Sequence, residues 1–584
     1  MSDASLTPPE SGGFNLDWRV ARRFAHFAGA YWTGATARQA WALTLALAGT
    51  LLLSTFVTVL MNQWNRWFFD ALERRDVAGL KQAVLVFFGI VAFMAAIGVG
   101  ILITRLTLQV RWRQWLVEHL IGRWLEAQKF YHLNASGIEP PNPEYRISDD
   151  TRWATEVLVD LGIGLLTAVL GGIAFIAILW SVGGSFSVGG ITVPGYMVWC
   201  ALAYGIAASA LTAWIGRPLV GRVGQKNEAE GYFRFAMMRL RDNAESIALV
   251  HGAAAEQRIL RGFYDTVVGR WLAIVRSNAH LTWITNATGP MIPIVPLLFA
   301  APKYLAGDLT LGQVTQMAAA FIQVQQAISW IVDNYSRIAD WYASARRVMD
   351  IVDASDKIAP SLPPVRTGVI LPHGLALSLD HVTLHAADGH ALLLPVTLDL
   401  KRGEAVHMAG ASNTGKSTLA RILAGLVVPT GGKLRGLASP SILLLPQKSY
   451  LPLGTLAEAI AYPRTGTPPP REALQSALDI AGLSALTARL SETARWDQVL
   501  SAGDRQRLAA ARAVISRPEI LVIDDALSAL DGTAQRTLIQ RLRVELPGLT
   551  VLSLGQRAAP ANTFDRTLEL TRLDHDAMLA RTAS

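Results

Sequence analysis

The segment Gly410-Ala-Ser-Asn-Thr-Gly-Lys-Ser-Thr418 decides the fold of the C-terminal part of the chain. It matches the pattern GxxxxGK[ST], follows a strand-like apolar stretch, Ala405–Met408, and opens a helix-like stretch, Leu419–Leu426. In that setting, backbone amides of the loop and of the helix N-terminus bind phosphate oxygens. Lys416 is expected to neutralise the β- and γ-phosphates of ATP, and Ser417 to supply an oxygen to Mg²⁺. The sequence therefore predicts an α/β nucleotide-binding domain.

A second motif supports this prediction. The apolar run Ile520–Ile523 is typical of a buried strand and ends in two carboxylates, Asp524 and Asp525. In phosphate-loop proteins a carboxylate at this point holds Mg²⁺, and we assign that role to Asp524. The nucleotide contacts predicted for the loop are Gly410, Ala411, Ser412, Asn413, Thr414, Gly415, Lys416, Ser417 and Thr418.

The composition places much of the remaining chain in a lipid bilayer. Of the 584 residues, 51% are hydrophobic and only 17% are charged, which is too apolar for an ordinary soluble protein. Uncharged stretches long enough to cross a hydrocarbon core of about 30 Å predict an all-α transmembrane domain of six helices. They are Trp41–Met61, Ala83–Thr104, Leu161–Val182, Tyr196–Trp214, Leu281–Pro302 and Leu311–Val332. Three prolines, Pro290, Pro293 and Pro296, predict a kink in the fifth span.

Basic residues indicate the orientation in the membrane. The segments between spans two and three and between spans four and five are rich in Arg, whereas the links 183–195 and 303–310 hold one basic residue between them. Because basic loops stay on the cytoplasmic side, both termini are predicted to be cytoplasmic. The net charge of +8 follows from this arrangement, and no nucleic-acid partner is expected. The single cysteine, Cys200, lies in an apolar span and predicts no disulfide framework.

Four segments are expected along the chain. Residues 1–38 form a cytoplasmic N-terminal segment, 39–350 the transmembrane domain, 351–370 a linker and 371–584 the ATP-binding domain. The boundary follows from the change to alternating short strands and helices after a proline-bearing stretch. Between spans four and five, residues 215–280 are expected to form two antiparallel cytoplasmic helices of about 50 Å each.

A third motif carries a resemblance to a known family. The segment Leu500-Ser501-Ala502-Gly503-Asp504 opens a helix and resembles the ABC signature, usually LSGGQ, in the order found in ABC ATPases. Gln447 falls at the Q-loop position, and Ser528–Asp531 resembles the D-loop. The resemblance implies that Gln447 contacts the nucleotide and Mg²⁺, and that Ser501 and Gly503 cover the ATP held by another chain. It therefore implies a dimer, formed with a second copy or with a related half-transporter.

The resemblance can be narrowed, and it covers roughly residues 40–560. The segment Leu445–Pro463 is similar to the branch that contains peroxisomal acyl-CoA transporters and their bacterial relatives. The membrane half resembles BacA/SbmA-type peptide transporters through the segments Leu60–Trp64, Phe68–Leu72, Arg111–Trp115 and Asn243–Ala248. These similarities imply transport of a bulky solute of peptide, corrinoid or fatty-acyl type, with import the commoner direction. They also imply a multi-pass protein of the bacterial inner membrane.

The sequence departs from the family at the positions that perform hydrolysis. Asp525 stands where ABC ATPases usually carry a Glu that holds the attacking water, and Gln556 stands at the position of the switch His. We assign both as catalytic positions. The shorter carboxylate stands about 1 Å too far back, and such a misplacement costs on the order of 10²-fold in rate. For stacking on the base, the segment before the phosphate loop offers only His385. The sequence predicts that ATP binds well and is hydrolysed slowly.

Three functions are compatible with these observations. The first is ATP-dependent transport by a dimeric half-transporter. The second is an ATP-gated regulator that does not hydrolyse ATP, which Asp525 and Gln556 favour. The third is one subunit of a heterodimer whose partner supplies the missing Glu and His.

Four glutamines of the sixth span share one helical face, and two roles are open for them. They can form a polar wall of the solute pathway, or they can hydrogen-bond to neighbouring helices of the bundle. The four residues are Gln313, Gln316, Gln323 and Gln326.

Overall fold

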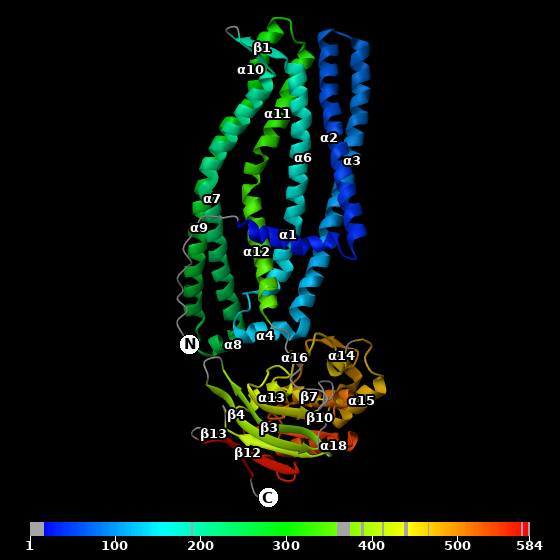
Figure 1. Ribbon diagram of the computed structural model, residues 1–584, viewed down its shortest axis with the longest axis vertical. Helices are drawn as coiled ribbons and strands as arrows, with labels where there is room; N and C mark the ends of the chain where they lie inside the picture. The colour runs from blue at the N-terminus through cyan, green and yellow to red at the C-terminus, as the bar shows by residue number, and fades with distance from the viewer. Residues whose placement is uncertain are drawn as a thin grey trace. The chain divides into compact units, whose positions relative to one another are not determined.

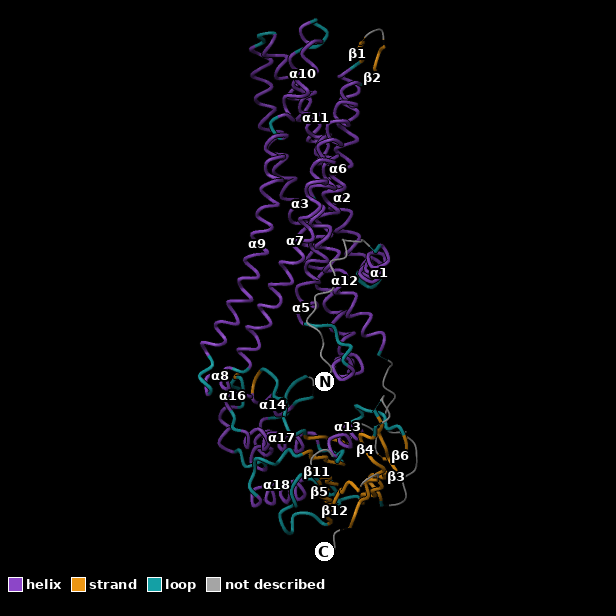
Figure 2. The backbone as a smooth tube through the Cα atoms, turned by 90° about the vertical axis from the view of Figure 1, so that its left-hand side faces the viewer, coloured by secondary structure: helices purple, strands orange, loops and turns teal. Residues whose placement is uncertain are grey.

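The computed structural model of the protein describes residues 17–188, 191–358, 374–386, 390–411, 414–436, 442–464, 466–573 and 576–581. The chain divides into two compact units, and the boundary between them along the sequence follows Ile358. Figure 2 shows long helices throughout the first unit, with only a short hairpin of strands at one end, and mixed strands and helices in the second. This is an all-α membrane domain followed by an α/β domain, as the sequence predicts.

Long helices dominate the first unit (Figure 1). They are preceded by a short amphipathic helix, α1, and two of them, α6 and α7, are joined by the hairpin of β1 and β2. The elements are α1 (Trp18–Gly29), η1 (Ala30–Trp32), α2 (Ala37–Glu73), α3 (Val77–Leu125), η2 (Glu126–Gln128), α4 (Lys129–Ser136), α5 (Pro143–Tyr145), η3 (Arg146–Asp150), α6 (Thr151–Gly183), β1 (Ser185–Val188), β2 (Ile191–Pro194), α7 (Tyr196–Asp242), α8 (Ala244–Leu249), α9 (Ala253–Thr288), α10 (Met291–Leu305), α11 (Leu311–Asp333) and α12 (Tyr335–Lys357).

Five helical stretches among the described residues are long and apolar enough to cross a membrane. Four of them contain the first four predicted spans, on α2, α3, α6 and α7. The fifth combines α9 and α10, which are separated at Gly289 and Pro290 inside the predicted span Leu281–Pro302. The break confirms the kink predicted from the prolines. Its physical reason is that Pro290 has no backbone N–H to continue the hydrogen bonds of α9.

The sixth predicted span, Leu311–Val332, forms α11, which is not among those five. Its glutamines lower its hydropathy, yet it packs against α2, α6 and α7 and so lies within the bundle. Gln313 completes a capping box with Thr310, and Gln316 is buried where its backbone oxygen accepts a hydrogen bond from the Asn62 side chain of α2 (3.1 Å). Helix capping accounts for the polar residue at position 313. At position 316 the bond uses only the backbone, and among the described residues the buried Gln316 Oε1 atom has no hydrogen-bond partner, so both roles stay open for this side chain.

The segment 215–280 forms two antiparallel helical halves, as the sequence predicts. The end of α7 pairs with the beginning of α9, and the short helix α8 joins them. Arg270 of α9 donates a hydrogen bond to Gln225 of α7 at 2.8 Å, and the Lys226 ammonium lies 4.8 Å from the Trp271 ring centroid. A hydrogen bond and a cation–π contact therefore join the two halves at this level.

Helix α12 is held to its neighbours by ion pairs. The Asp150 carboxylate is fully buried and accepts two hydrogen bonds from Arg347, at 2.8 and 2.6 Å. Arg146 donates to Asp350 at 2.8 Å. The helix continues to Lys357 because its last turns bury apolar side chains, so the predicted linker 351–370 begins in a helix. Residues 359–370 lie outside the described part of the chain.

The second unit is built on a mixed sheet of six strands in the order β13-β12-β5-β11-β10-β7. All neighbouring strands in it are parallel except β12 and β13. An antiparallel sheet of β4, β3 and β6 adds a second layer. The strands are β3 (Leu375–His385), β4 (Ala391–Lys401), β5 (Ala405–Gly410), β6 (Gly431–Gly436), β7 (Ile442–Leu445), β8 (Gly454–Thr455), β9 (Thr493–Ala494), β10 (Ile520–Asp524), β11 (Thr550–Gly555), β12 (Arg566–Leu573) and β13 (Asp576–Arg581).

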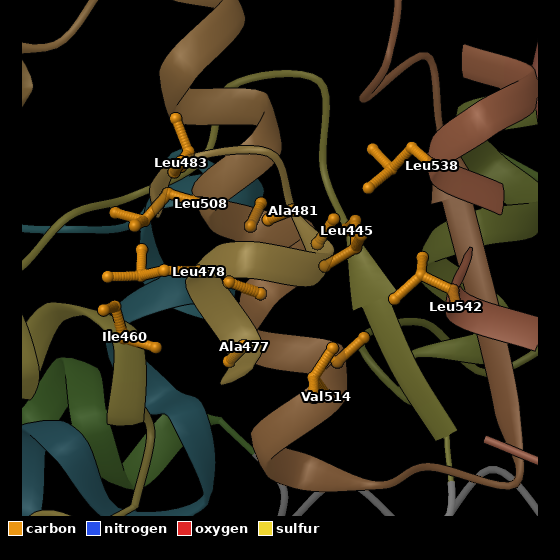
Figure 3. Close-up of a cluster of buried hydrophobic side chains, with 14 of the residues drawn as sticks. Leu445, Ile460, Ala477, Leu478, Ala481, Leu483, Leu508, Val514, Leu538 and Leu542 are labelled. Carbon is orange, nitrogen blue, oxygen red and sulfur yellow. The ribbon is translucent and has the colours of Figure 1, made fainter. Parts of the chain in front are cut away.

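Helices cover the six-stranded sheet, and its two faces belong to two hydrophobic cores. Along β10, Leu521 and Ile523 pack into one core, whereas Ile520 and Val522 pack into the other, as the two-residue period of a strand requires. Figure 3 shows part of the first core, where Leu445 of β7 lies among apolar side chains of the covering helices. The helices of this unit are α13 (Lys416–Leu423), α14 (Leu456–Ala461), α15 (Arg471–Ile480), η5 (Ser484–Arg489), α16 (Trp496–Val499), α17 (Ala502–Ser516) and α18 (Gly532–Glu545).

Candidate nucleotide-binding site

The predicted site residues meet where the parallel strands end. Strands β5, β11, β10 and β7 are consecutive neighbours in the sheet and run in the same direction. Their carboxyl ends therefore lie along one edge, where open α/β sheets bind ligands. The phosphate loop follows β5, Gln556 follows β11, Asp524 ends β10 and Gln447 follows β7.

The phosphate loop connects β5 to α13, as its motif predicts. Gly415 has a φ of 91°, and a Cβ there would lie 2.7 Å from the Cδ1 atom of Leu393. A Cβ on Gly410 would lie 2.8 Å from the Leu570 carbonyl oxygen. Both positions therefore require glycine. Thr414 and Thr418 lie in the described part of the loop and helix, whereas Ser412 and Asn413 lie outside the described residues.

Lys416 is the buried cation of this loop. Its ammonium donates hydrogen bonds to the carbonyl oxygens of Gly410 (2.7 Å) and Ala411 (2.6 Å) and to the Thr414 hydroxyl (3.1 Å). Burial lowers the pKa of Lys416, and the charges of Asp525 and Asp524 oppose that shift. The ammonium is thus held beside the first turn of α13, whose unbonded amides attract anions.

Two of the residues predicted to hold Mg²⁺, Ser417 and Asp524, contact each other. The Ser417 hydroxyl donates to the Asp524 carboxylate at 3.4 Å. Burial raises the pKa of Asp524, the Ser417 hydrogen bond opposes this, and the neighbouring charge of Asp525 adds to it. A hydroxyl and a carboxylate are oxygen donors suited to Mg²⁺, which binds one or two carboxylates together with phosphate oxygens. Gln447 is exposed just beyond Leu445, the residue of β7 that is in register with Ile523 of β10.

Asp525 and Gln556 contact each other. Asp525 has a φ of 51°, a left-handed conformation that Asp tolerates better than most residues. Its backbone N–H donates to Leu554 O at 2.9 Å, and its carboxylate accepts a hydrogen bond from the backbone N–H of Gln556 at 3.3 Å. The two predicted catalytic positions therefore lie next to each other, at the ends of the neighbouring strands β10 and β11.

Ser501 and Gly503 belong to a different part of the domain. Ser501 is exposed and caps α17, where its hydroxyl donates to the Asp504 carboxylate at 2.7 Å and accepts from the Asp504 N–H at 3.1 Å. A Cβ on Gly503 would meet its neighbours no closer than 3.6 Å, so packing within the chain does not require glycine there. The interactions described for both residues run within this region and not to the phosphate loop.

Two histidines near the site have contacts that the sequence does not predict. His385, the candidate ring for stacking on the base, has its Nδ1 atom 3.1 Å from the Thr430 hydroxyl, which also accepts from the His385 N–H at 3.1 Å. The sequence analysis assigns no role to His407, which is buried in β5 and contacts the segment after β11. The sequence signal that could have pointed to His407 is its place as a titratable residue in an otherwise apolar strand before the phosphate loop.

Comparison with known proteins agrees with this geometry. Residues 32–305 match the family described as ABC transporter transmembrane region 2, and residues 393–528 match the family described as ABC transporter. The chain belongs to the ABC transporters. The phosphate loop, the signature helix and the strand that ends at Asp524 are thus the ATP-binding domain of such a transporter.

Relatives of the transporter span nearly all of it. An ABC transporter ATP-binding protein of Synechocystis is 29% identical over 91% of this chain and 81% of that protein. The lysosomal cobalamin transporter ABCD4 of Homo sapiens is 25% identical over 98% of each chain. In fold, the transporter is similar to a bacterial Atm1-family ABC exporter solved with ATP bound, with a TM-score of 0.74, 18% identity, and coverage of 92% of this chain and 95% of that one.

Replacing Lys416 tests the site directly. In the Lys416→Ala variant we expect the dissociation constant for ATP to rise at least about tenfold, because a charge-assisted hydrogen bond contributes roughly 1.5–3 kcal/mol. The thermal midpoint of the purified protein should change little, since the hydrogen bonds described for the ammonium all run to the loop itself. Binding is measured by calorimetry, with Lys433→Ala on the exposed side of β6 as the matched control. Equal ATP affinity in the two variants would show that Lys416 does not bind ATP.

Proposed function

We propose that the protein is an ATP-driven half-transporter that works as a dimer and moves a bulky solute across the membrane. The observation that carries the proposal is the ATP-binding geometry around Lys416 and Asp524 in a chain that also contains a bundle of membrane-length helices. We place the transmembrane domain at residues 39–350 and the ATP-binding domain at 371–584. The ATP-binding domain and both termini lie in the cytoplasm, and the membrane is the inner membrane of a bacterium.

The solute class follows from similarity. The relative in Homo sapiens is named for cobalamin, a bulky corrinoid, and it aligns with this chain from end to end. We therefore propose a solute of corrinoid, peptide or fatty-acyl type. We propose that the long antiparallel pair formed by α7 and α9 transmits the conformational change driven by ATP to the membrane bundle. A hydrogen bond and a cation–π contact join its two halves, which favours their moving as one body.

Uptake experiments test this proposal. The purified protein, reconstituted in proteoliposomes with ATP on the side of the ATP-binding domain, is offered labelled cobalamin, a labelled hydrophilic peptide and a labelled fatty acyl-CoA. We expect ATP-dependent movement of one of these, and none by the Lys416→Ala variant. Transport that Lys416→Ala leaves unchanged would contradict an ATP-driven mechanism.

Dimerisation is proposed from the separation of the two halves of the site. Lys416 and Ser417 lie next to each other at the phosphate loop, and Ser417 contacts Asp524. Ser501 and Gly503 lie at the start of α17, and their described contacts do not include the phosphate loop. In the proposed dimer, Ser501 and Gly503 of one chain cover the ATP bound at Lys416 of the other. A second copy of the chain is the proposed partner.

Mixed dimers distinguish a shared site from a self-contained one. When Lys416→Ala and Ser501→Arg are placed on different chains, we expect one intact composite site and about half of the wild-type hydrolysis. When both substitutions are on one chain and the other is wild type, both composite sites are damaged and hydrolysis should be lost. Differently tagged chains are co-purified, and ATP hydrolysis is measured. The reverse pattern would show that each chain forms its own site.

We also propose that hydrolysis is slow. The Asp525 carboxylate is short and accepts a hydrogen bond from the Gln556 N–H, which directs it toward the backbone of the β11 turn. Gln556 can donate a hydrogen bond to phosphate but cannot carry a proton near neutral pH. Neither residue removes a group that binds phosphate, so ATP affinity is preserved. The same observation favours the alternative of a heterodimer whose partner supplies the catalytic Glu and His.

Single-turnover hydrolysis measures the rate independently of transport. Restoring the usual pair, with Asp525→Glu and Gln556→His together, should raise the rate on the order of 10²-fold, because the carboxylate and the proton carrier return to the attacking water. ATP affinity should stay within about threefold. If the wild type already hydrolyses ATP as fast as the doubly substituted protein, the proposal of slow hydrolysis is wrong. A second half-transporter that co-purifies and restores the rate would establish the heterodimer.

A further inference from the structure

His407 is a buried histidine in β5, three residues before the glycine that opens the phosphate loop. Only 5% of it is exposed, and both of its ring nitrogens have partners. Nε2 lies 2.9 Å from the backbone carbonyl oxygen of Arg557, and Nδ1 lies 3.1 Å from the Ser553 hydroxyl. The ring thus links the strand that enters the phosphate loop to the segment that leaves β11.

The partners determine which ring nitrogen carries the proton. A carbonyl oxygen can only accept, so Nε2 must donate to Arg557. In the neutral ring, Nδ1 is then an acceptor, and the Ser553 hydroxyl donates to it. Burial lowers the pKa of His407, against smaller opposing effects of the Arg557 carbonyl and the Asp525 charge. The neutral ring with its proton on Nε2 satisfies every hydrogen bond in this pocket.

The segment that receives this hydrogen bond carries Gln556. On one side, the Gln556 N–H donates to the Asp525 carboxylate at 3.3 Å. On the other side, the carbonyl of the next residue, Arg557, accepts from His407 at 2.9 Å. The backbone is therefore held on both sides of the Gln556 side chain. The Gln556 side chain itself is exposed at the edge of the site.

Gly555 makes this close approach possible. A Cβ at Gly555 would lie 2.7 Å from the Cε1 atom of His407, a distance that real contacts do not reach. The ring also packs on Phe564, with ring centroids 5.2 Å apart. His407 therefore occupies a fitted space between the β11 turn and Phe564, and the sequence of the turn accommodates it.

We propose that His407 is a positioning residue for ATP hydrolysis, holding the Arg557 carbonyl so that the backbone presents Gln556 to the terminal phosphate. This inference rests on the proposed ATP-driven function. It adds that the phosphate-loop strand and the Gln556 turn are tied together through one imidazole. An apolar residue would fill the space next to Phe564 equally well, but it would remove the donor to Arg557. The hydrogen bond, and not the volume, is the functional feature.

Two substitutions separate the hydrogen bond from packing. His407→Leu keeps an apolar side chain in the pocket and removes the donor. His407→Gln retains an amide N–H that is the same number of bonds from the backbone as Nε2. We expect single-turnover hydrolysis to fall about tenfold in His407→Leu and to stay within about threefold of wild type in His407→Gln. ATP affinity should be unchanged in both, because neither group belongs to the phosphate loop.

Amide hydrogen exchange in the full-length protein provides a readout that does not depend on hydrolysis. The Gln556 amide should exchange several-fold faster in His407→Leu than in wild type or His407→Gln. In a Gln556→Ala background, His407→Leu should cause no further loss of rate, because its effect passes through that residue. Unchanged exchange at Gln556, or an equal rate loss with and without Gln556, would overturn the proposal. A wild-type protein that hydrolyses no ATP would refute the proposed function, and the exchange measurement would still decide whether His407 holds this turn.

Discussion

The parallel pairing of β5, β11, β10 and β7 is the constraint on which the ATP site depends. Because these strands run in one direction, the segments that follow them must emerge at the same edge of the sheet. This pairing brings Lys416 close enough to the carboxylates of Asp524 and Asp525 for their charges to affect its pKa. Removing an ammonium and two carboxylates from water costs free energy, and the attraction between these opposite charges offsets part of that cost. In the proposed ATP complex, phosphate and Mg²⁺ would supply the remaining charges.

The same strand ends also explain why the catalytic positions behave as a unit. Asp525 adopts a left-handed backbone, and its carboxylate bonds to the turn that carries Gln556. His407 holds that turn from the other side through Arg557. We therefore expect a change at any of these residues to alter where Gln556 points. In the proposed mechanism, binding and hydrolysis are separable, since the groups proposed to hold phosphate lie on a different loop.

The membrane unit is stabilised differently from the ATP-binding domain. Within the bilayer, apolar side chains can face lipid, and specific helix contacts come from small or polar groups. The Asn62 side chain of α2 supplies such a contact by donating to the backbone oxygen of Gln316 in α11. Outside the apolar stretches, the partly exposed Arg347 guanidinium of α12 donates two hydrogen bonds to the buried Asp150 carboxylate at the start of α6. Loss of Arg347 would leave the buried Asp150 carboxylate without this partner, so the pair favours packing of α12 against α6.

The sequence by itself determined the two-part architecture, the membrane-length helices and the phosphate loop, because each depends on local composition or on a short continuous motif. The prolines near Pro290 predicted the break between α9 and α10 for the same reason. The tertiary structure alone decided which polar residues meet across the chain. Hydropathy could not show that Gln316 packs against Asn62, and no local pattern could show that His407 reaches Arg557. These contacts join residues distant in sequence, and they exist only because strand pairing and helix packing bring their backbones together.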